Sequence, residues 1–97
     1  MSEEIFEELF AVIEDRKQEM PEGSYTAALF ADDKGENAVL EKLGEEMTEL
    51  ILAAKDDDEA AIAHESADLV YHLFVLLAAK DVSLAELRAE LRDRRPG

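Results

Sequence analysis

The sequence contains no cysteine, and only two prolines and four glycines among 97 residues. Without cysteine, neither a disulfide bond nor a thiolate metal site can form. No hydrophobic run is long either: the stretch 69–79 is interrupted by Tyr71 and His72, and a membrane-spanning helix needs roughly 18 to 20 apolar residues. We therefore expect this stretch to be a core helix and expect no membrane partner. The lack of a recognisable secretory signal favours the cytoplasm.

Basic residues are also scarce, with 10 Lys plus Arg against 25 Asp plus Glu and a formal net charge of −15. Nucleic acid is an unexpected partner for such a chain, because affinity for the phosphate backbone depends on clustered Lys and Arg. The excess charge repels itself at low ionic strength. One interpretation is a protein that works in high salt, and the other is an ordinary acidic, solvated surface.

The pattern of apolar residues predicts one all-α domain over residues 1–97. A chain this short buries a small share of its surface, which favours self-association. Helical spacing predicts a first helix from about Ser2 to Gln18, with Ser2 as its N-cap. The turn-rich segment 20–35 is expected to be a loop with a short helical piece at 26–30, and long loops are usually functional. Further helices are predicted at 36–55, 59–80 and 83–94, the last beginning with a capping box at 83–86.

Two acidic pairs, Glu46-x-x-Glu49 and Glu65-x-x-Asp68, occupy the second and third long helices. On a helical wheel each pair lies along the same-sense edge of an apolar stripe. The connector 56–58 is short enough to make the two helices antiparallel neighbours. The pairs also lie at similar heights, about seven to twelve residues from the turn at about 1.5 Å per residue. The four carboxylates are therefore predicted to converge.

Such a cluster needs a compensating cation, since two unit charges 4 Å apart repel by about 4 kcal/mol at an effective dielectric near 20. An all-oxygen site selects Mg²⁺, Mn²⁺ or Ca²⁺ over zinc. The alternative is a solvated acidic face with no metal. His64 and His72 are poor support for zinc without cysteine, and we expect His72 to be a packed or hydrogen-bonded residue.

The same pairs are similar to the signature of the all-α nucleoside triphosphate pyrophosphohydrolase (MazG-like) superfamily. Over nearly the whole chain, the sequence more narrowly resembles the phosphoribosyl-ATP pyrophosphatase family, in the segments 21–26, 29–30, 42–46, 49, 53–55 and 67–73. The resemblance implies a four-to-five-helix bundle with a central antiparallel hairpin, completed by oligomerisation as a homodimer or larger assembly. It also implies Mg²⁺-dependent hydrolysis of phosphoribosyl-ATP to phosphoribosyl-AMP and pyrophosphate, the second step of histidine biosynthesis.

Carried over position by position, the resemblance implies metal ligands at Glu46, Glu49, Glu65 and Asp68. Glu45 would be a further ligand or would orient water, and which carboxylate acts as the base stays open. Other residues are expected to contact the substrate, namely Lys42, Lys55, Ser24, Tyr25 and Thr26. The two lysines can equally be helix-surface charges, whereas for the three hydroxyl residues a role in forming the turn is the less favoured alternative.

Two other functions remain open at this point. One is a house-cleaning enzyme that uses the same metal site on other nucleoside triphosphates; the loop 21–26 favours the phosphoribosyl-ATP substrate over it. The other is a non-catalytic acidic helical module that dimerises through its apolar stripes and needs no metal.

Overall fold

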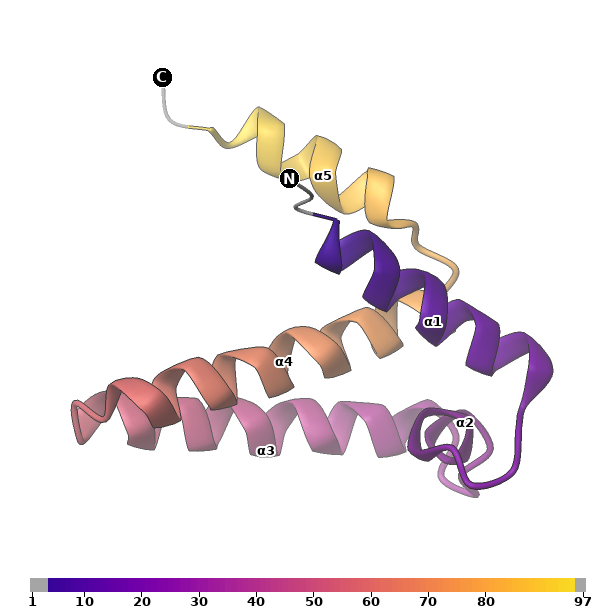
Figure 1. The fold of residues 1–97 in the computed structure, drawn as a ribbon, viewed down its shortest axis with the longest axis horizontal. Coiled ribbons are helices and arrows are strands. Elements are labelled where there is room, and N and C mark those ends of the chain that lie inside the picture. Colours follow the sequence, from indigo (N-terminus) through magenta and orange to yellow (C-terminus); the bar gives the residue numbers. More distant parts are fainter. Residues whose placement is uncertain (1–3, 96–97) are drawn as a thin grey trace.

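The computed structural model describes residues 4–95, which form α-helices and contain no strand. Figure 1 shows their arrangement. The predicted all-α architecture is confirmed, and the predicted N-cap Ser2 lies outside the described residues. The five helices are α1 (Ile5–Glu19), α2 (Tyr25–Phe30), α3 (Glu36–Lys55), α4 (Glu59–Ala79) and α5 (Leu84–Asp93).

The two longest helices, α3 and α4, form an antiparallel hairpin (Figure 1). The turn between them is tight because Asp57 adopts a left-handed conformation, with φ at 55°. Asp58 then caps α4, its side chain accepting a hydrogen bond of 3.1 Å from the Ala61 N–H. A connector this short requires α4 to run back along α3.

The hydrophobic core lies at the end of this hairpin that is farther from the turn. There α1 crosses α4, and α2 covers the start of α3 (Figure 1). Ile13, Val39 and Val75 are fully buried. The Phe74 ring packs edge-to-face on Phe10, with 5.6 Å between the ring centroids. Residues of the four helices α1 to α4 meet in this core, whereas the hairpin extends beyond α1 and α2 as a two-helix arm.

Short capping motifs begin the two shorter helices. Ser24 caps α2 by accepting a hydrogen bond from the Ala27 N–H. Ser83 and Glu86 form the predicted capping box at the start of α5. An ion pair between Arg88 and Glu7 then connects α5 to α1. These contacts hold the segments that flank the hairpin against its core end.

The outer face of the hairpin leaves large apolar side chains in solvent. Leu40, Met47 and Ile51 are 42–54% exposed, and they follow one another at helical spacing along α3. By length and composition α4 would be able to cross a membrane, yet only 17% of its most apolar window is buried within the chain. The single chain therefore leaves much of its apolar helix surface uncovered.

Candidate metal centre

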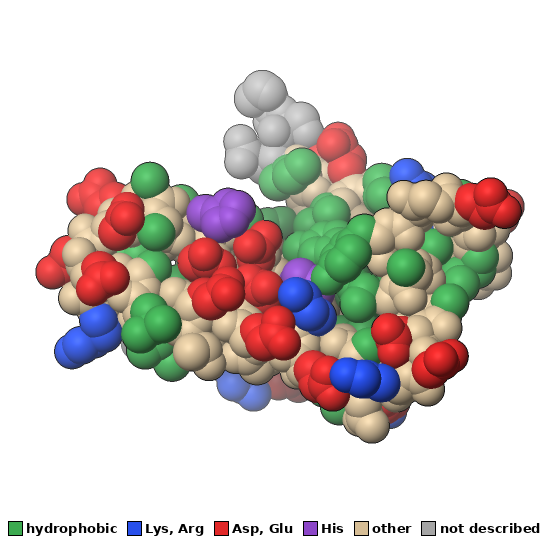
Figure 2. Space-filling view, turned by 90° about the horizontal axis from the view of Figure 1, so that it is seen from below, with side chains coloured by type: hydrophobic (Ala, Val, Ile, Leu, Met, Phe, Trp, Pro, Cys, Tyr) green, Lys and Arg blue, Asp and Glu red, His purple; other side chains and the backbone are tan. Residues whose placement is uncertain are grey.

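The four predicted ligands lie on the facing sides of α3 and α4, in the middle of the hairpin. Glu46 and Glu49 come from α3, while Glu65 and Asp68 come from α4. One carboxylate oxygen from each of Glu46, Glu49 and Glu65 lies within 4.8 Å of the other two. In Figure 2, acidic side chains gather in the middle of one face beside a hydrophobic patch. Three of the four predicted carboxylates therefore meet across the hairpin, while Asp68 groups with Glu65 and His64 instead.

Two oxygens in this cluster are buried without any hydrogen-bond partner among the described residues: Glu46 Oε1 and Glu65 Oε1. Glu46 is only 6% exposed. A buried carboxylate oxygen without a partner is costly, because burial removes its water and nothing replaces it. A divalent cation would supply the missing partner, and the all-oxygen donor set of these glutamates fits Mg²⁺.

The pKa of the Glu65 carboxyl reflects the same crowding of carboxylates. Burial, followed by the hydrogen bond and the negative charge of Glu49, raises the pKa of the Glu65 carboxyl above its usual value. A raised carboxyl pKa means that the protein environment disfavours a further negative charge at this position. A bound cation would reverse that effect, because an opposite charge favours the ionised form.

Glu45 differs from its neighbour Glu46 in that its side chain is 60% exposed. Its carboxylate accepts a hydrogen bond of 3.3 Å from Lys42 Nζ, and both side chains are partly exposed. This bond raises the pKa of the Lys42 ammonium above its usual value. Lys42 and Glu45 thus stand as a pair at the rim of the centre, where a phosphate group could compete for the lysine. Lys55 lies farther away, in the last turn of α3.

From the sequence, His64 was considered only for zinc, and its position beside the acidic pairs was not predicted. His64 Nε2 lies 3.4 Å from Asp68 Oδ2, and donor atoms of His64, Glu65 and Asp68 lie within 4.8 Å of one another. Glu65 therefore belongs to two groups of potential ligands. The spacing could have indicated this contact, because His64 and Asp68 are four residues apart and so share one helix face.

The hydroxyl residues of the loop have different surroundings. The Ser24 hydroxyl caps α2. Thr26 is 8% exposed, and its hydroxyl is hydrogen-bonded to the Tyr71 hydroxyl. Tyr25 is 51% exposed, and its hydroxyl oxygen lies 3.0 Å from His72 Nε2. As substrate contacts all three stay predictions, and Tyr25 has the most accessible side chain of the three.

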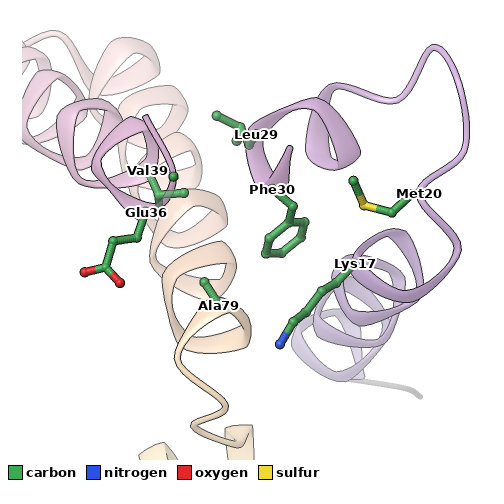
Figure 3. A pocket seen from close by; sticks show the side chains of 8 residues that line it. Lys17, Met20, Leu29, Phe30, Glu36, Val39 and Ala79 are labelled. Atoms are coloured by element: carbon green, nitrogen blue, oxygen red, sulfur yellow. The ribbon is translucent and has the colours of Figure 1, made fainter. Parts of the chain in front are cut away.

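A cavity of about 410 Å³ lies at the core end of the hairpin, away from the carboxylates. Phe30, Val39 and Ala79 contribute apolar walls (Figure 3). Its lysine, Lys17, already donates to the Ala78 carbonyl oxygen at 2.8 Å and to Asp81 at 3.0 Å. Lys17 is therefore already occupied by partners within the chain and is less available to a phosphate group. The carboxylate cluster is the better candidate site, because a bound cation there would attract phosphate.

Comparison of the sequence with known proteins identifies a family. Residues 6–95 match the sequence model of a family described as phosphoribosyl-ATP pyrophosphohydrolase. The chain belongs to that family. A phosphoribosyl-ATP pyrophosphatase of Haloarcula marismortui is 68% identical over 92 residues, covering 95% of this chain and 94% of the relative.

Other relatives carry the same name. The phosphoribosyl-ATP pyrophosphatase of Natronomonas pharaonis is 70% identical over 93 residues, covering 96% of this chain and 92% of the relative. That of Bacillus cytotoxicus is 47% identical over 92 residues, covering 95% and 84%. The resemblance drawn from the sequence motifs is thus confirmed at the level of the family. Pyrophosphohydrolysis is chemistry that divalent cations commonly serve.

Proposed function

We propose that this chain hydrolyses phosphoribosyl-ATP to phosphoribosyl-AMP and pyrophosphate, the second step of histidine biosynthesis, with Mg²⁺ as its cofactor. The observation that carries the proposal is the family match over residues 6–95, together with the convergence of three glutamates and the unpartnered oxygen of buried Glu46. Neither feature is expected of a helical module whose acidic residues are only solvated.

In this mechanism Glu46, Glu49, Glu65 and Asp68 would hold the metal. When bound, Mg²⁺ cancels charge on both carboxylates and phosphates and lowers the pKa of a water molecule. The residues around this centre would position the triphosphate for hydrolysis at the α–β phosphate bridge, where the bond to the β-phosphate breaks and pyrophosphate leaves phosphoribosyl-AMP. Glu45 would be a further ligand or would orient water, and in the metal-free chain its carboxylate pairs with Lys42 at 3.3 Å.

The substrate contacts that we propose surround this centre. Lys42 and Lys55 would neutralise phosphate charge, with Lys42 exchanging its Glu45 partner for a phosphate oxygen. Ser24, Tyr25 and Thr26 would contact the phosphoribosyl or phosphate groups. Tyr25 is the strongest candidate of the three, because its side chain is half exposed and the positive charge of Lys42 acts on its hydroxyl group.

We further propose that the active protein is a homodimer or a larger homo-oligomer in the cytoplasm. The exposed stripe of Leu40, Met47 and Ile51 on α3 supports this assembly. Apolar stripes of this kind are typically covered by another helix. Cross-linking or light scattering of the purified protein tests the proposal, and a monomer at all concentrations would contradict it.

The test of activity is pyrophosphate release from phosphoribosyl-ATP and from ATP, with Mg²⁺ and with EDTA, in low and in molar salt. Release from phosphoribosyl-ATP alone, only with metal, is the expected result. Release from ordinary triphosphates would indicate a house-cleaning enzyme instead. No release in any salt would leave the non-catalytic module as the explanation.

Variants test the ligand assignment in the same assay. Replacing Glu49 or Asp68 with Ala is expected to abolish turnover and leave the fold intact. Glu14→Gln is the matched control, because it also removes one negative charge but from an exposed position on α1. Retained turnover in Glu49→Ala or Asp68→Ala would refute the assignment.

A further inference from the structure

The His72 side chain connects α2, which begins at Tyr25, to the backbone of α4. His72 is 5% exposed. Its Nδ1 lies 2.9 Å from the backbone carbonyl oxygen of Asp68, and its Nε2 lies 3.0 Å from the Tyr25 hydroxyl oxygen. His72 therefore links Tyr25, which is 47 positions away in sequence, to the backbone of Asp68, a predicted metal ligand.

The chemistry of these partners determines where the protons are. A carbonyl oxygen can only accept, so His72 Nδ1 carries the hydrogen and donates to Asp68. Neither hydrogen-bond partner is charged, since Nδ1 meets a carbonyl and Nε2 meets a hydroxyl. In the neutral ring Nε2 is then an acceptor, so the Tyr25 hydroxyl must donate to it.

This hydrogen bond fixes the direction in which the Tyr25 hydroxyl hydrogen points. Its single hydroxyl hydrogen points inward to His72, which leaves only lone pairs for groups that approach from solvent. The Tyr25 ring is held from two sides, since it stacks on Tyr71 with centroids 6.2 Å apart and meets His72 edge-on at 5.9 Å. The hydroxyl oxygen is therefore fixed in position as well as in polarity.

We propose that His72 is a positioning residue that holds Tyr25 as a pure hydrogen-bond acceptor, so that Tyr25 selects a donor group of the substrate. Such donors are sugar hydroxyls and base amino groups, whereas ionised phosphate oxygens offer no hydrogen to donate. This inference rests on the proposed function, because it names which part of that substrate Tyr25 contacts. The phosphates are left to Lys42 and the metal centre.

The placement of the proton can be measured without any turnover. The chain contains two histidines, so a ¹⁵N spectrum of the imidazoles shows two rings, and His64→Gln identifies the signals of His72. We expect His72 to be protonated at Nδ1 and unprotonated at Nε2 at neutral pH. A ring protonated at Nε2 would overturn the inference, because Tyr25 would then accept and its own hydrogen would be free.

Kinetics with phosphoribosyl-ATP test the consequence for substrate binding. Asn at position 72 retains a donor for the Asp68 carbonyl but has no acceptor within reach of Tyr25, whereas Gln retains the acceptor. We expect His72→Asn and Tyr25→Phe each to raise KM about three- to tenfold, the effect of one hydrogen bond, with kcat changed less than twofold. His72→Gln should recover most of the loss.

A double-variant comparison separates positioning from a general loss of folding. Adding His72→Asn to Tyr25→Phe should raise KM no further, since both changes break one hydrogen bond. Tyr71→Phe is the matched control: it removes the other tyrosine hydroxyl, which bonds Thr26, and its effect should multiply with that of His72→Asn. Multiplying effects for Tyr25→Phe, or no recovery with Gln, would overturn the inference. A wild-type chain without turnover would instead refute the proposed function, while the imidazole spectrum would still decide the proton placement.

Discussion

Replacing Glu46 with Gln is expected to stabilise the metal-free protein and to remove its response to Mg²⁺. Glu46 is 6% exposed, and its Oε1 has no hydrogen-bond partner among the described residues. Its carboxylate lies within 4.8 Å of an oxygen of Glu49. Gln has nearly the same shape, carries no charge, and presents an amide N–H₂ that can donate to this neighbouring carboxylate.

The magnitude follows from that separation. Two unit charges 4.8 Å apart repel by about 3.5 kcal/mol at an effective dielectric near 20. Glu49 is exposed, so water and salt screen part of this repulsion, and we expect a net gain of about 1–2 kcal/mol. In a domain of this size each kcal/mol shifts Tm by about 4–8 °C. The variant should therefore melt roughly 5–15 °C higher in EDTA.

Thermal unfolding followed by circular dichroism, in EDTA and in saturating Mg²⁺, measures both effects. A ligand at 100 times its Kd stabilises the folded state by about 2.7 kcal/mol, so wild type should gain Tm with Mg²⁺ while Glu46→Gln should gain almost none. Glu14→Gln is again the matched control, and it should retain the Mg²⁺ response. A lower Tm for Glu46→Gln in EDTA, or a full Mg²⁺ shift in this variant, would refute the reasoning.

Three further predictions concern helix ends, a mid-helix glycine and salt. Ser83→Ala should lower the unfolding free energy by about 1 kcal/mol at pH 7 in urea titrations. Glu86→Gln should also be destabilised at pH 7, and its deficit should shrink on acidification. Hydrogen bonds from the Ser83 backbone N–H and from its side chain lower the Glu86 pKa, so their contribution is present above the ordinary glutamate pKa and is lost as the pH falls through the lowered value; a constant deficit would contradict this. Gly44→Ala should raise stability by about 1 kcal/mol, since nothing in the described chain lies within 4 Å of the added Cβ, whereas Gly35→Ala should destabilise because Gly35 has φ of +64°; destabilisation by Gly44→Ala would show that a second chain covers this face. Molar KCl should raise Tm, because it screens the net charge of −15, and a Tm independent of salt would contradict the self-repulsion.

The sequence by itself determined the helices and the hairpin. The predicted long helices are confirmed near their expected bounds, because apolar residues at helical spacing fix which face of each helix is buried. The three-residue connector 56–58 forces α4 back along α3, so the heights of Glu46, Glu49, Glu65 and Asp68 follow from counting residues. The meeting of Glu46, Glu49 and Glu65 across the hairpin needed only this local geometry.

Only the tertiary structure decided which side chains from distant segments meet. Helical periodicity places Tyr25 and His72 on their own helices, but their hydrogen bond depends on how the loop 20–24 brings α2 onto α4. Likewise, neighbouring Glu45 and Glu46 look alike in sequence, yet one pairs with Lys42 in solvent and the other is buried between two helices. The physical reason is that the rotation of a helix about its axis, and the angle at which helices cross, are set by packing of the whole core.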